Sequence, residues 1–299
     1  MGGEIKNVES GVYATGTGKL TINGEAKITF TRDYGVKVEG GATADITGAT
    51  ITGGGSGQGV IKDGAGEMTM TKVDISRVQT GIQVTSGNLT VSGGTMTGVE
   101  KGIDMSGSGR LTVNNNARIT FTGDYGIGVG NGVTANITGA EIKGGGQGMG
   151  VGSKGVIMES SRTMMMTKGS ISNVEKAVLM NGAGKLVMNN VQISGVKMGV
   201  EATKGNLTIS GNSVITFKNG DRNYGVKVGR EVTMASLTNV AIRGGGNGKG
   251  VYATGAKAVT LTKVDISNVS EGVLMKGGGT LTIKEGSIGF KGGADNYVG

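Results

Sequence analysis

A short frame of residues returns along the whole chain and limits what the chain can fold into. The frame reads Leu-Thr-Ile, then Ile-Thr, then Gly-Val-x-Val, and it recurs about every 21 to 27 residues. One copy consists of Leu20-Thr21-Ile22, Ile28-Thr29-Phe30 and Gly35-Val36-Lys37-Val38. Such self-similarity indicates a solenoid, because each repeat can bury its apolar face only against its neighbours.

The Gly-Val/Ile element of this frame occurs twelve times, and Val or Ile always follows its first residue. Two residues further on the side chain is again apolar, except at Lys62 and Ser153. Alternation with β-branched residues is typical of strands. The element opens at Gly11, Gly35, Gly59, Gly81, Gly102, Gly126, Gly150, Ala177, Gly199, Gly225, Gly250 and Gly272.

Three short strands per repeat, separated by Gly, Asn and Ser turns, leave no room for helices. We therefore predict an all-β, right-handed parallel β-helix of about 12 coils, with three short strands in each. The right hand follows from the strong preference of parallel crossover connections. The frame runs without a break, so residues 1–299 are expected to form a single continuous domain.

Both ends of the sequence resemble the interior of a coil. Ile5-Lys6-Asn7-Val8 matches Ile266-Ser267-Asn268-Val269, and Phe290 with Asn296-Tyr297 begins another cycle. Natural solenoids end in polar caps, and neither end shows one. We expect the chain to be a fragment cut from something longer at both ends.

The composition disfavours an enzyme. Cys and His are both absent, so the chain lacks a thiolate nucleophile and the commonest general base and metal ligand. Asp33 and Asp124 occupy equivalent positions four coils apart, roughly 19 Å, which exceeds the separation of a glycosidase pair. Triple-glycine segments such as Gly53-Gly54-Gly55 lack the following Asp of calcium-binding repeats. We predict no catalytic residue, no cofactor and no metal.

The charge suits anionic partners. Lys and Arg number 30 against 22 Asp and Glu, which gives a net charge of +8. These charges are spread along the coils without a basic run, so no nucleic-acid partner is predicted. Heparan sulfate is a candidate partner, and a solvated basic surface is the simpler interpretation. No apolar run reaches membrane-spanning length, so no membrane insertion is expected.

A repeat longer than one coil is also visible, because an Asp/Asn-Tyr-Gly segment recurs several coils apart. Its tyrosines are Tyr34, Tyr125 and Tyr224, and each stands beside charged residues. An exposed tyrosine next to a cation is typical of a binding hot spot. A tyrosine that covers a corner of the solenoid explains the same pattern. If the first interpretation holds, the partner-binding residues are Arg32, Tyr34, Lys37, Arg222, Tyr224 and Lys227.

The coils also resemble a known family. Gly11-Val12-Tyr13-Ala14-Thr15-Gly16, Ala26-Lys27-Ile28-Thr29-Phe30 and Ile51-Thr52-Gly53-Gly54-Gly55 are similar to coils in the passenger domains of autotransporters, particularly those of Bartonella. The resemblance covers the whole chain, although it lies in the style of the coils and includes no catalytic motif.

The resemblance implies secretion or display on the bacterial surface, by way of an outer-membrane translocation domain that this chain does not contain. For angiogenic passengers it also implies growth-factor-like action on endothelial cells through a vascular endothelial growth factor receptor. Our hypothesis is therefore a secreted passenger that binds a host cell-surface receptor and activates a receptor tyrosine kinase. The alternative is an adhesin for sulfated glycans or extracellular matrix.

Overall fold

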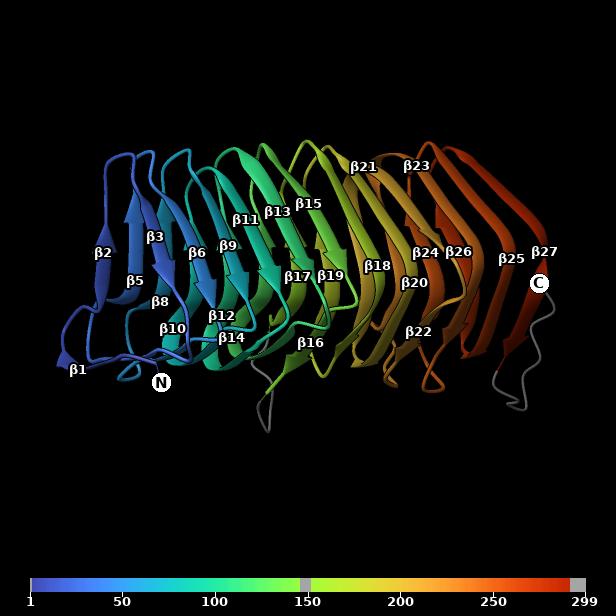
Figure 1. Cartoon of the computed structure of the whole chain (residues 1–299). Helices are drawn as coiled ribbons and strands as arrows, with labels where there is room; N and C mark the ends of the chain where they lie inside the picture. The colour runs from blue at the N-terminus through green and yellow to red at the C-terminus, as the bar shows by residue number, and fades with distance from the viewer. Residues whose placement is uncertain (1, 146–151, 291–299) are drawn as a thin grey trace.

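The chain forms a rod of stacked parallel strands, which runs from the N-terminus at one end to the C-terminus at the other (Figure 1). The structure is a computed structural model that describes residues 2–145 and 152–290. The strands are β1 Glu4–Val8, β2 Val12–Ala14, β3 Lys19–Ile22, β4 Lys27–Phe30, β5 Tyr34–Glu39, β6 Thr43–Thr47, β7 Thr50–Thr52, β8 Gln58–Asp63, β9 Glu67–Thr71, β10 Asp74–Val84, β11 Asn88–Ser92, β12 Thr95–Met105, β13 Gly109–Asn114, β14 Arg118–Val129, β15 Val133–Thr138, β16 Glu141–Gly144, β17 Lys154–Met158, β18 Thr163–Ser172, β19 Lys176–Met180, β20 Lys185–Val196, β21 Met198–Ser210, β22 Ser213–Phe217, β23 Tyr224–Arg243, β24 Lys249–Thr254, β25 Ala258–Val269, β26 Glu271–Lys276 and β27 Thr280–Phe290.

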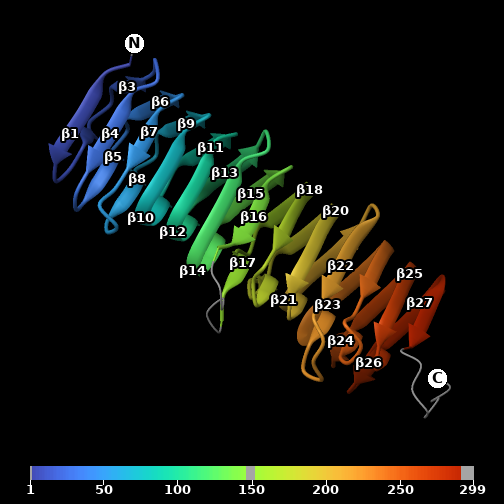
Figure 2. The ribbon, with the colours of Figure 1, turned by 90° about the horizontal axis from the view of Figure 1, so that it is seen from below.

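Each turn of the rod contributes to three parallel sheets. The Leu-Thr-Ile strands stack from β3 and β6 onward and form the threonine sheet, whose first members lie side by side in Figure 1. The Ile-Thr strands stack from β1, β4 and β7 onward and form the second sheet. Figure 2 shows these strands from below the rod. The Gly-Val strands stack from β2, β5 and β8 onward and form the tyrosine sheet.

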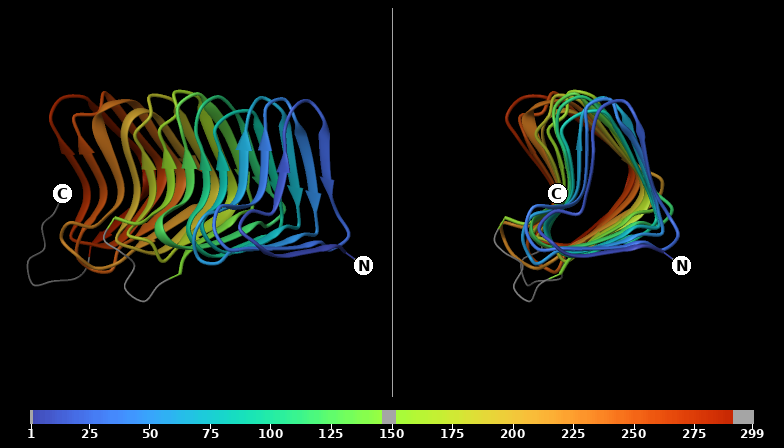
Figure 3. Two further views of the ribbon diagram at one scale, coloured as in Figure 1. Left: turned by 90° about the vertical axis from the view of Figure 1, so that its left-hand side faces the viewer. Right: turned by 60° about the vertical axis from the view of Figure 1, so that its left-hand side comes forward.

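Long strands bend around a corner and serve two sheets. β10, for example, pairs with β7 through Asp74–Ser76 and with β8 through Thr80–Val84. In the right-hand view of Figure 3, which looks more nearly down the long axis of the rod, successive turns overlap in one outline with strands along its sides. The predicted fold class is confirmed, since the chain is a right-handed parallel β-helix of about 12 turns.

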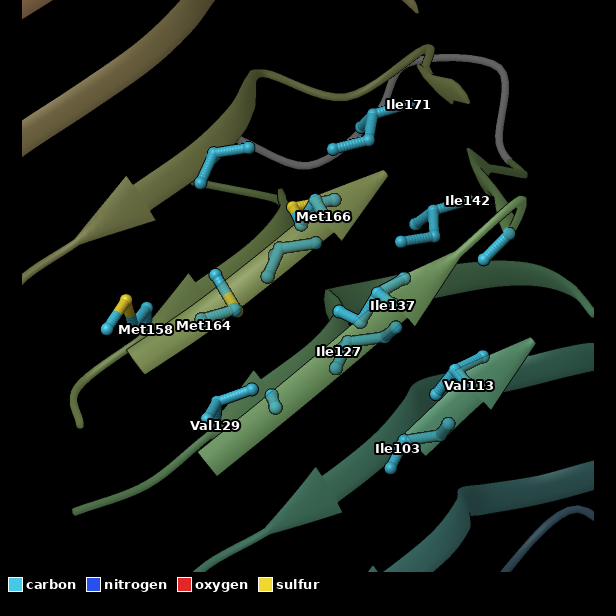
Figure 4. Close-up of a cluster of buried hydrophobic side chains, with 14 of the residues drawn as sticks. Ile103, Val113, Ile127, Val129, Ile137, Ile142, Met158, Met164, Met166 and Ile171 are labelled. Atoms are coloured by element: carbon cyan, nitrogen blue, oxygen red, sulfur yellow. The ribbon is translucent and has the colours of Figure 1, made fainter. Parts of the chain in front are cut away.

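The interior of the rod is a continuous apolar core. Inward residues of successive turns stack in rows along the axis, and methionines fill several of the same rows (Figure 4). Buried members in the middle of the rod include Ile103, Val113, Ile127, Val129, Ile137, Ile142, Met158, Met164, Met166 and Ile171. None of the residues that the structure describes forms a helix long and apolar enough to cross a membrane.

The glycine that opens each Gly-Val element is required by close approach between turns. A Cβ atom on Gly102 would lie 2.3 Å from the Gly126 carbonyl oxygen and 2.5 Å from Cγ2 of Ile119. Both distances are far below van der Waals contact. The side-chain volume at this position is therefore limited by the next turn, and only Ala177 replaces glycine in the series.

One element of the predicted frame was placed wrongly. The seventh Gly-Val element was predicted to open at Gly150, which lies outside the described residues. In the structure Val156 of β17 pairs with Ile127, and a Cβ on Gly155 would lie 2.3 Å from Cγ2 of Ile171. Gly155-Val156 therefore takes the position in the stack.

Several corners use residues other than glycine in the left-handed region. Lys72, Lys168 and Lys263 have φ of 51°, 50° and 53° at the corner that follows the threonine sheet. They share the Thr-Lys-x-x-Ile-Ser motif of one coil type. Asn190 and Asn239 have φ of 54° at the same corner. Asparagine accepts this conformation more readily than most residues, whereas lysine at φ > 0 is uncommon.

Lys62 is a buried cation within an otherwise apolar row. It pairs in register with Val38 and Val84, and its exposed fraction is 0 %. Its Nζ donates a hydrogen bond to the carbonyl oxygen of Gly64 at 2.6 Å. Burial lowers the pKa of the Lys62 ammonium, because the charged form is poorly solvated there. Met105 is buried in the same row two turns further on, so an unbranched apolar chain of similar length is already accommodated at an equivalent position.

Replacement of Lys62 by Met is expected to raise the melting temperature at pH 7, by a stabilisation of about 1–2 kcal/mol. The folded lysine has a lowered pKa, so between that pKa and 10.5 the unfolded state binds more protons. The stability of the wild-type protein therefore rises with pH in this window, and the advantage of K62M shrinks. Thermal unfolding of both proteins at pH 7 and pH 10 measures the two effects. K27M, which replaces an exposed lysine, is the control. A melting temperature of K62M at pH 7 that equals or falls below that of the wild-type protein contradicts the prediction.

Replacement of Gly102 by Val is expected to destabilise the rod by about 3 kcal/mol, because the added carbons overlap backbone of the next turn. Gly18 is a matched control, since nothing lies within 4 Å of a Cβ built there. Urea denaturation of G102V and G18V gives the comparison. If G102V and G18V were equally stable, the close approach of the next turn would not be the reason that position 102 requires glycine.

Candidate recognition surface

The outer faces of the three sheets differ in chemistry. The threonine sheet presents small polar residues in register across the turns, such as Thr69, Thr90 and Thr112. The second sheet likewise presents Thr29, Thr52 and their neighbours. The tyrosine sheet carries every tyrosine of the part of the chain that the structure describes. These are Tyr13, Tyr34, Tyr125, Tyr224 and Tyr252.

A lysine ammonium lies over each of these rings. The distances from Nζ to the ring centroid are 5.8 Å for Lys37 on Tyr13, 5.9 Å for Lys37 on Tyr34, 5.3 Å for Lys101 on Tyr125, 5.7 Å for Lys227 on Tyr224 and 5.9 Å for Lys249 on Tyr252. A contact of this kind contributes about 0.5–1 kcal/mol where the ring is exposed, as at Tyr13. We call this outer surface the tyrosine face.

An N-terminal cluster on the tyrosine face consists of Tyr13, Tyr34, Lys37 and Glu39. Tyr13 Oη donates a hydrogen bond to Glu39 Oε2 at 2.7 Å, and Lys37 forms an ion pair with the same carboxylate. The hydrogen bond to Glu39 raises the pKa of Lys37 despite some desolvation. Tyr13 is 53 % exposed, so its ring remains available to a partner.

A C-terminal cluster is built around the carboxylate of Glu201. Tyr224 Oη donates to Glu201 Oε2 at 2.8 Å, and Lys227 Nζ lies 2.9 Å from Oε1. Lys176 forms a further ion pair with this carboxylate. These contacts follow from register, because Lys176, Glu201 and Lys227 stand on three successive turns.

The electrostatics of this cluster hold it together. Burial of Glu201 opposes its ionisation, but the hydrogen bonds from Lys176 and Lys227 prevail and lower its pKa to about 2. Burial, followed by the charge of Glu201, raises the pKa of the Tyr224 hydroxyl. Both groups therefore keep one protonation state across the physiological range.

Two further residues complete the C-terminal cluster on its outer side. Tyr252 pairs in register with Lys227, and Lys249 forms an ion pair with Glu271 at 3.3 Å. The cluster thus comprises Lys176, Glu201, Tyr224, Lys227, Lys249 and Tyr252.

Tyr125 lies between the two clusters and is packed down onto the sheet. A Cβ on Gly128 would lie 2.7 Å from Cε2 of Tyr125, so the ring covers this glycine. Burial raises the pKa of Tyr125, with a further contribution from Asp104. Outward Ile61 and Ile157 add apolar surface between the clusters.

The structure brings the predicted residues together in two groups. Tyr34 and Lys37 belong to the N-terminal cluster, and Tyr224 and Lys227 belong to the C-terminal cluster, eight turns further along the rod. At a strand spacing of about 4.8 Å the groups are roughly 38 Å apart. Tyr224 is only 5 % exposed, so its role in the cluster is mainly to hold Glu201.

The two predicted arginines lie on corners beside the tyrosine face. Arg32 is exposed and forms an ion pair with Glu9 at 3.1 Å. Arg222 is exposed in the bend before β23. Both flank a cluster and neither enters it.

Sequence reasoning missed several members of the clusters, namely Tyr13, Glu39, Lys176, Glu201, Lys249 and Tyr252. Three of them, Tyr13, Glu201 and Tyr252, lie in the Gly-Val-x-Val element, whereas Glu39, Lys176 and Lys249 directly flank it. Tyr13, Lys37, Glu201, Lys227 and Tyr252 all occupy its third position, which points outward from the sheet. Alignment of these positions between turns would have revealed them.

Among the residues that the structure describes, no group of three or more acidic side chains is placed to hold a metal ion.

Comparison with known families supports the architecture. Residues 4–117 match a family model described as a right-handed β-helix region. No curated protein matches the chain. The match and the solenoid fit a β-helix domain of the pectate-lyase-like or autotransporter-passenger type.

Replacement of Glu201 by Gln is expected to destabilise the protein at pH 7 by about 3 kcal/mol, because Lys176 and Lys227 lose a shared partner. The folded pKa of about 2 lies below the ordinary 4.5, so the stabilisation is present above pH 4.5 and is lost as the pH falls toward 2. Melting temperatures of both proteins from pH 7 to pH 2 should converge. The control E271Q removes an exposed ion pair and is expected to have little effect on the melting temperature. If the melting temperatures of E201Q and the wild-type protein differ by the same amount at all pH values, the lowered pKa of Glu201 is contradicted.

Proposed function

We propose that this β-helix is a non-catalytic binding domain that recognises a host cell-surface receptor through the tyrosine face. The observation that carries the proposal is the gathering of all five described tyrosines on one sheet, each beside a lysine. Tyrosine supplies a large amphipathic contact area and is enriched in protein interfaces. The lysine and carboxylate contacts hold these rings in place before a partner arrives, which lowers the entropic cost of binding.

The two clusters suit a growth-factor-like mode of action. They lie on the same face of a stiff scaffold, roughly 38 Å apart at about 4.8 Å per turn. A rod with two separated contact regions can engage two copies of a receptor and hold them near each other. A receptor tyrosine kinase that is activated by pairing of its copies would respond to such a ligand.

The resemblance of the coils to Bartonella passenger domains supports a finer assignment. In this proposal the protein is secreted or displayed on the bacterial surface. It acts on endothelial cells as a proangiogenic ligand of a vascular endothelial growth factor receptor.

The proposal predicts that Tyr13→Ala and Tyr252→Ala each weaken binding to the receptor ectodomain, and that the double variant loses about 2 kcal/mol or more. Each single variant keeps one intact cluster, so it should bind the ectodomain but fail to raise receptor phosphorylation in endothelial cells. Surface plasmon resonance and phosphotyrosine blots measure the two effects.

Met234 provides a matched control for this experiment. It is 56 % exposed on the threonine sheet, so M234A removes exposed apolar surface from a different face. Unchanged receptor binding by the double tyrosine variant, or an equal loss by M234A, would exclude the tyrosine face as the receptor site.

A further inference from the structure

A row of basic residues follows one corner of the rod in its C-terminal half. This corner joins the tyrosine sheet to the threonine sheet. Each of the last six turns carries one exposed Lys or Arg there. They are Arg162, Lys185, Lys204, Arg230, Lys257 and Lys276, which we call the basic ridge.

Backbone contacts link the ridge from turn to turn. Lys185 N donates to the carbonyl oxygen of Arg162 at 3.1 Å, and Lys204 pairs in register with Glu231, the neighbour of Arg230. Further along, Lys257 N donates to Val232, and Lys276 pairs in register with Thr254. The six side chains therefore leave the rod from consecutive turns on one edge.

In the N-terminal half of the rod, the same corner carries more acidic than exposed basic residues. Its exposed basic residues there are Lys19 and Arg110, and Lys19 is paired with Asp45 at 2.5 Å. The acidic residues Glu39, Asp63 and Glu67 outnumber them. In the C-terminal half only Glu159 and Glu231 face six cations. The net positive charge of this edge therefore lies in its C-terminal half.

The ridge cations are free to take a ligand. Within residues 2–145 and 152–290, none of the six forms an ion pair with a carboxylate, whereas the lysines of the tyrosine face do. At about 4.8 Å per turn the row spans roughly 24 Å. Neighbouring charges lie within one Debye length of each other, so their potentials add.

We propose that the basic ridge binds a linear sulfated polysaccharide, aligned along the edge of the rod. Cations at one corner of six consecutive turns match one extended polyanion laid along the rod. Single-stranded nucleic acids are bound with the help of aromatic side chains that stack on bases, and no aromatic side chain stands on the ridge. Anionic membranes are bound by basic faces with adjoining Trp, Phe or Leu side chains, and the ridge lacks these as well.

The test compares two variants of equal charge. K204Q/R230Q/K257Q removes three ridge cations, and K27Q/R110Q/K143Q removes three exposed cations elsewhere. The ridge variant should bind a heparin oligosaccharide roughly tenfold more weakly at 0.15 M salt. The slope of log K against log salt concentration should fall by roughly 2 to 3. The control variant should remain close to the wild-type protein.

Equal losses in both variants would show that only net charge matters and would overturn the proposal. Stronger ridge-dependent binding to a single-stranded oligonucleotide or to phosphatidylserine vesicles than to heparin would also overturn it. The result is independent of the receptor proposal, because the ridge variant should still bind the isolated receptor ectodomain. Conversely, Y13A/Y252A should keep its affinity for heparin.

Discussion

Hydrogen bonding between the backbones of successive turns is the constraint on which the rest of this molecule depends. It fixes the separation of the turns at about 4.8 Å and places equivalent residues directly above one another. The inward positions must then supply apolar side chains of compatible volume, turn after turn. At the start of each Gly-Val strand the approach is so close that a Cβ on Gly102 would overlap the carbonyl oxygen of Gly126. The periodic glycine is a direct consequence of this spacing.

The same constraint organises the outside of the rod. A residue type that recurs at one position of the repeat becomes a row on the surface, and this is how tyrosines and lysines come together on the tyrosine face. It also allows two halves of one edge to differ, as the acidic N-terminal half and the basic ridge do. Charged clusters such as that of Glu201 form where single side chains of opposite charge stand on adjacent turns.

The regular part of the fold could be predicted from the sequence because its period is visible in single residues such as Gly35 and Val36. The frame failed where the period changed, since a second Gly-Val pair at Gly155 competes with Gly150 and only strand pairing decides between them. The candidate site was partly predictable. Proximity along the chain suggested the contact of Tyr34 with Lys37. The hydrogen bond between Tyr224 and Glu201 instead joins two successive turns, 23 residues apart in the sequence. The burial of Tyr224 depends on neighbours that no local pattern specifies.

The separation of the two clusters depends on the number of turns between them. Because each turn is a complete structural unit, gain or loss of one turn between Lys37 and Glu201 would change their separation by a single increment of about 4.8 Å and leave both contact regions intact. The number of turns therefore sets the distance between the two clusters, in steps of one strand spacing. Relatives with a different number of turns would hold the two clusters at a different distance, changed in whole steps of one turn.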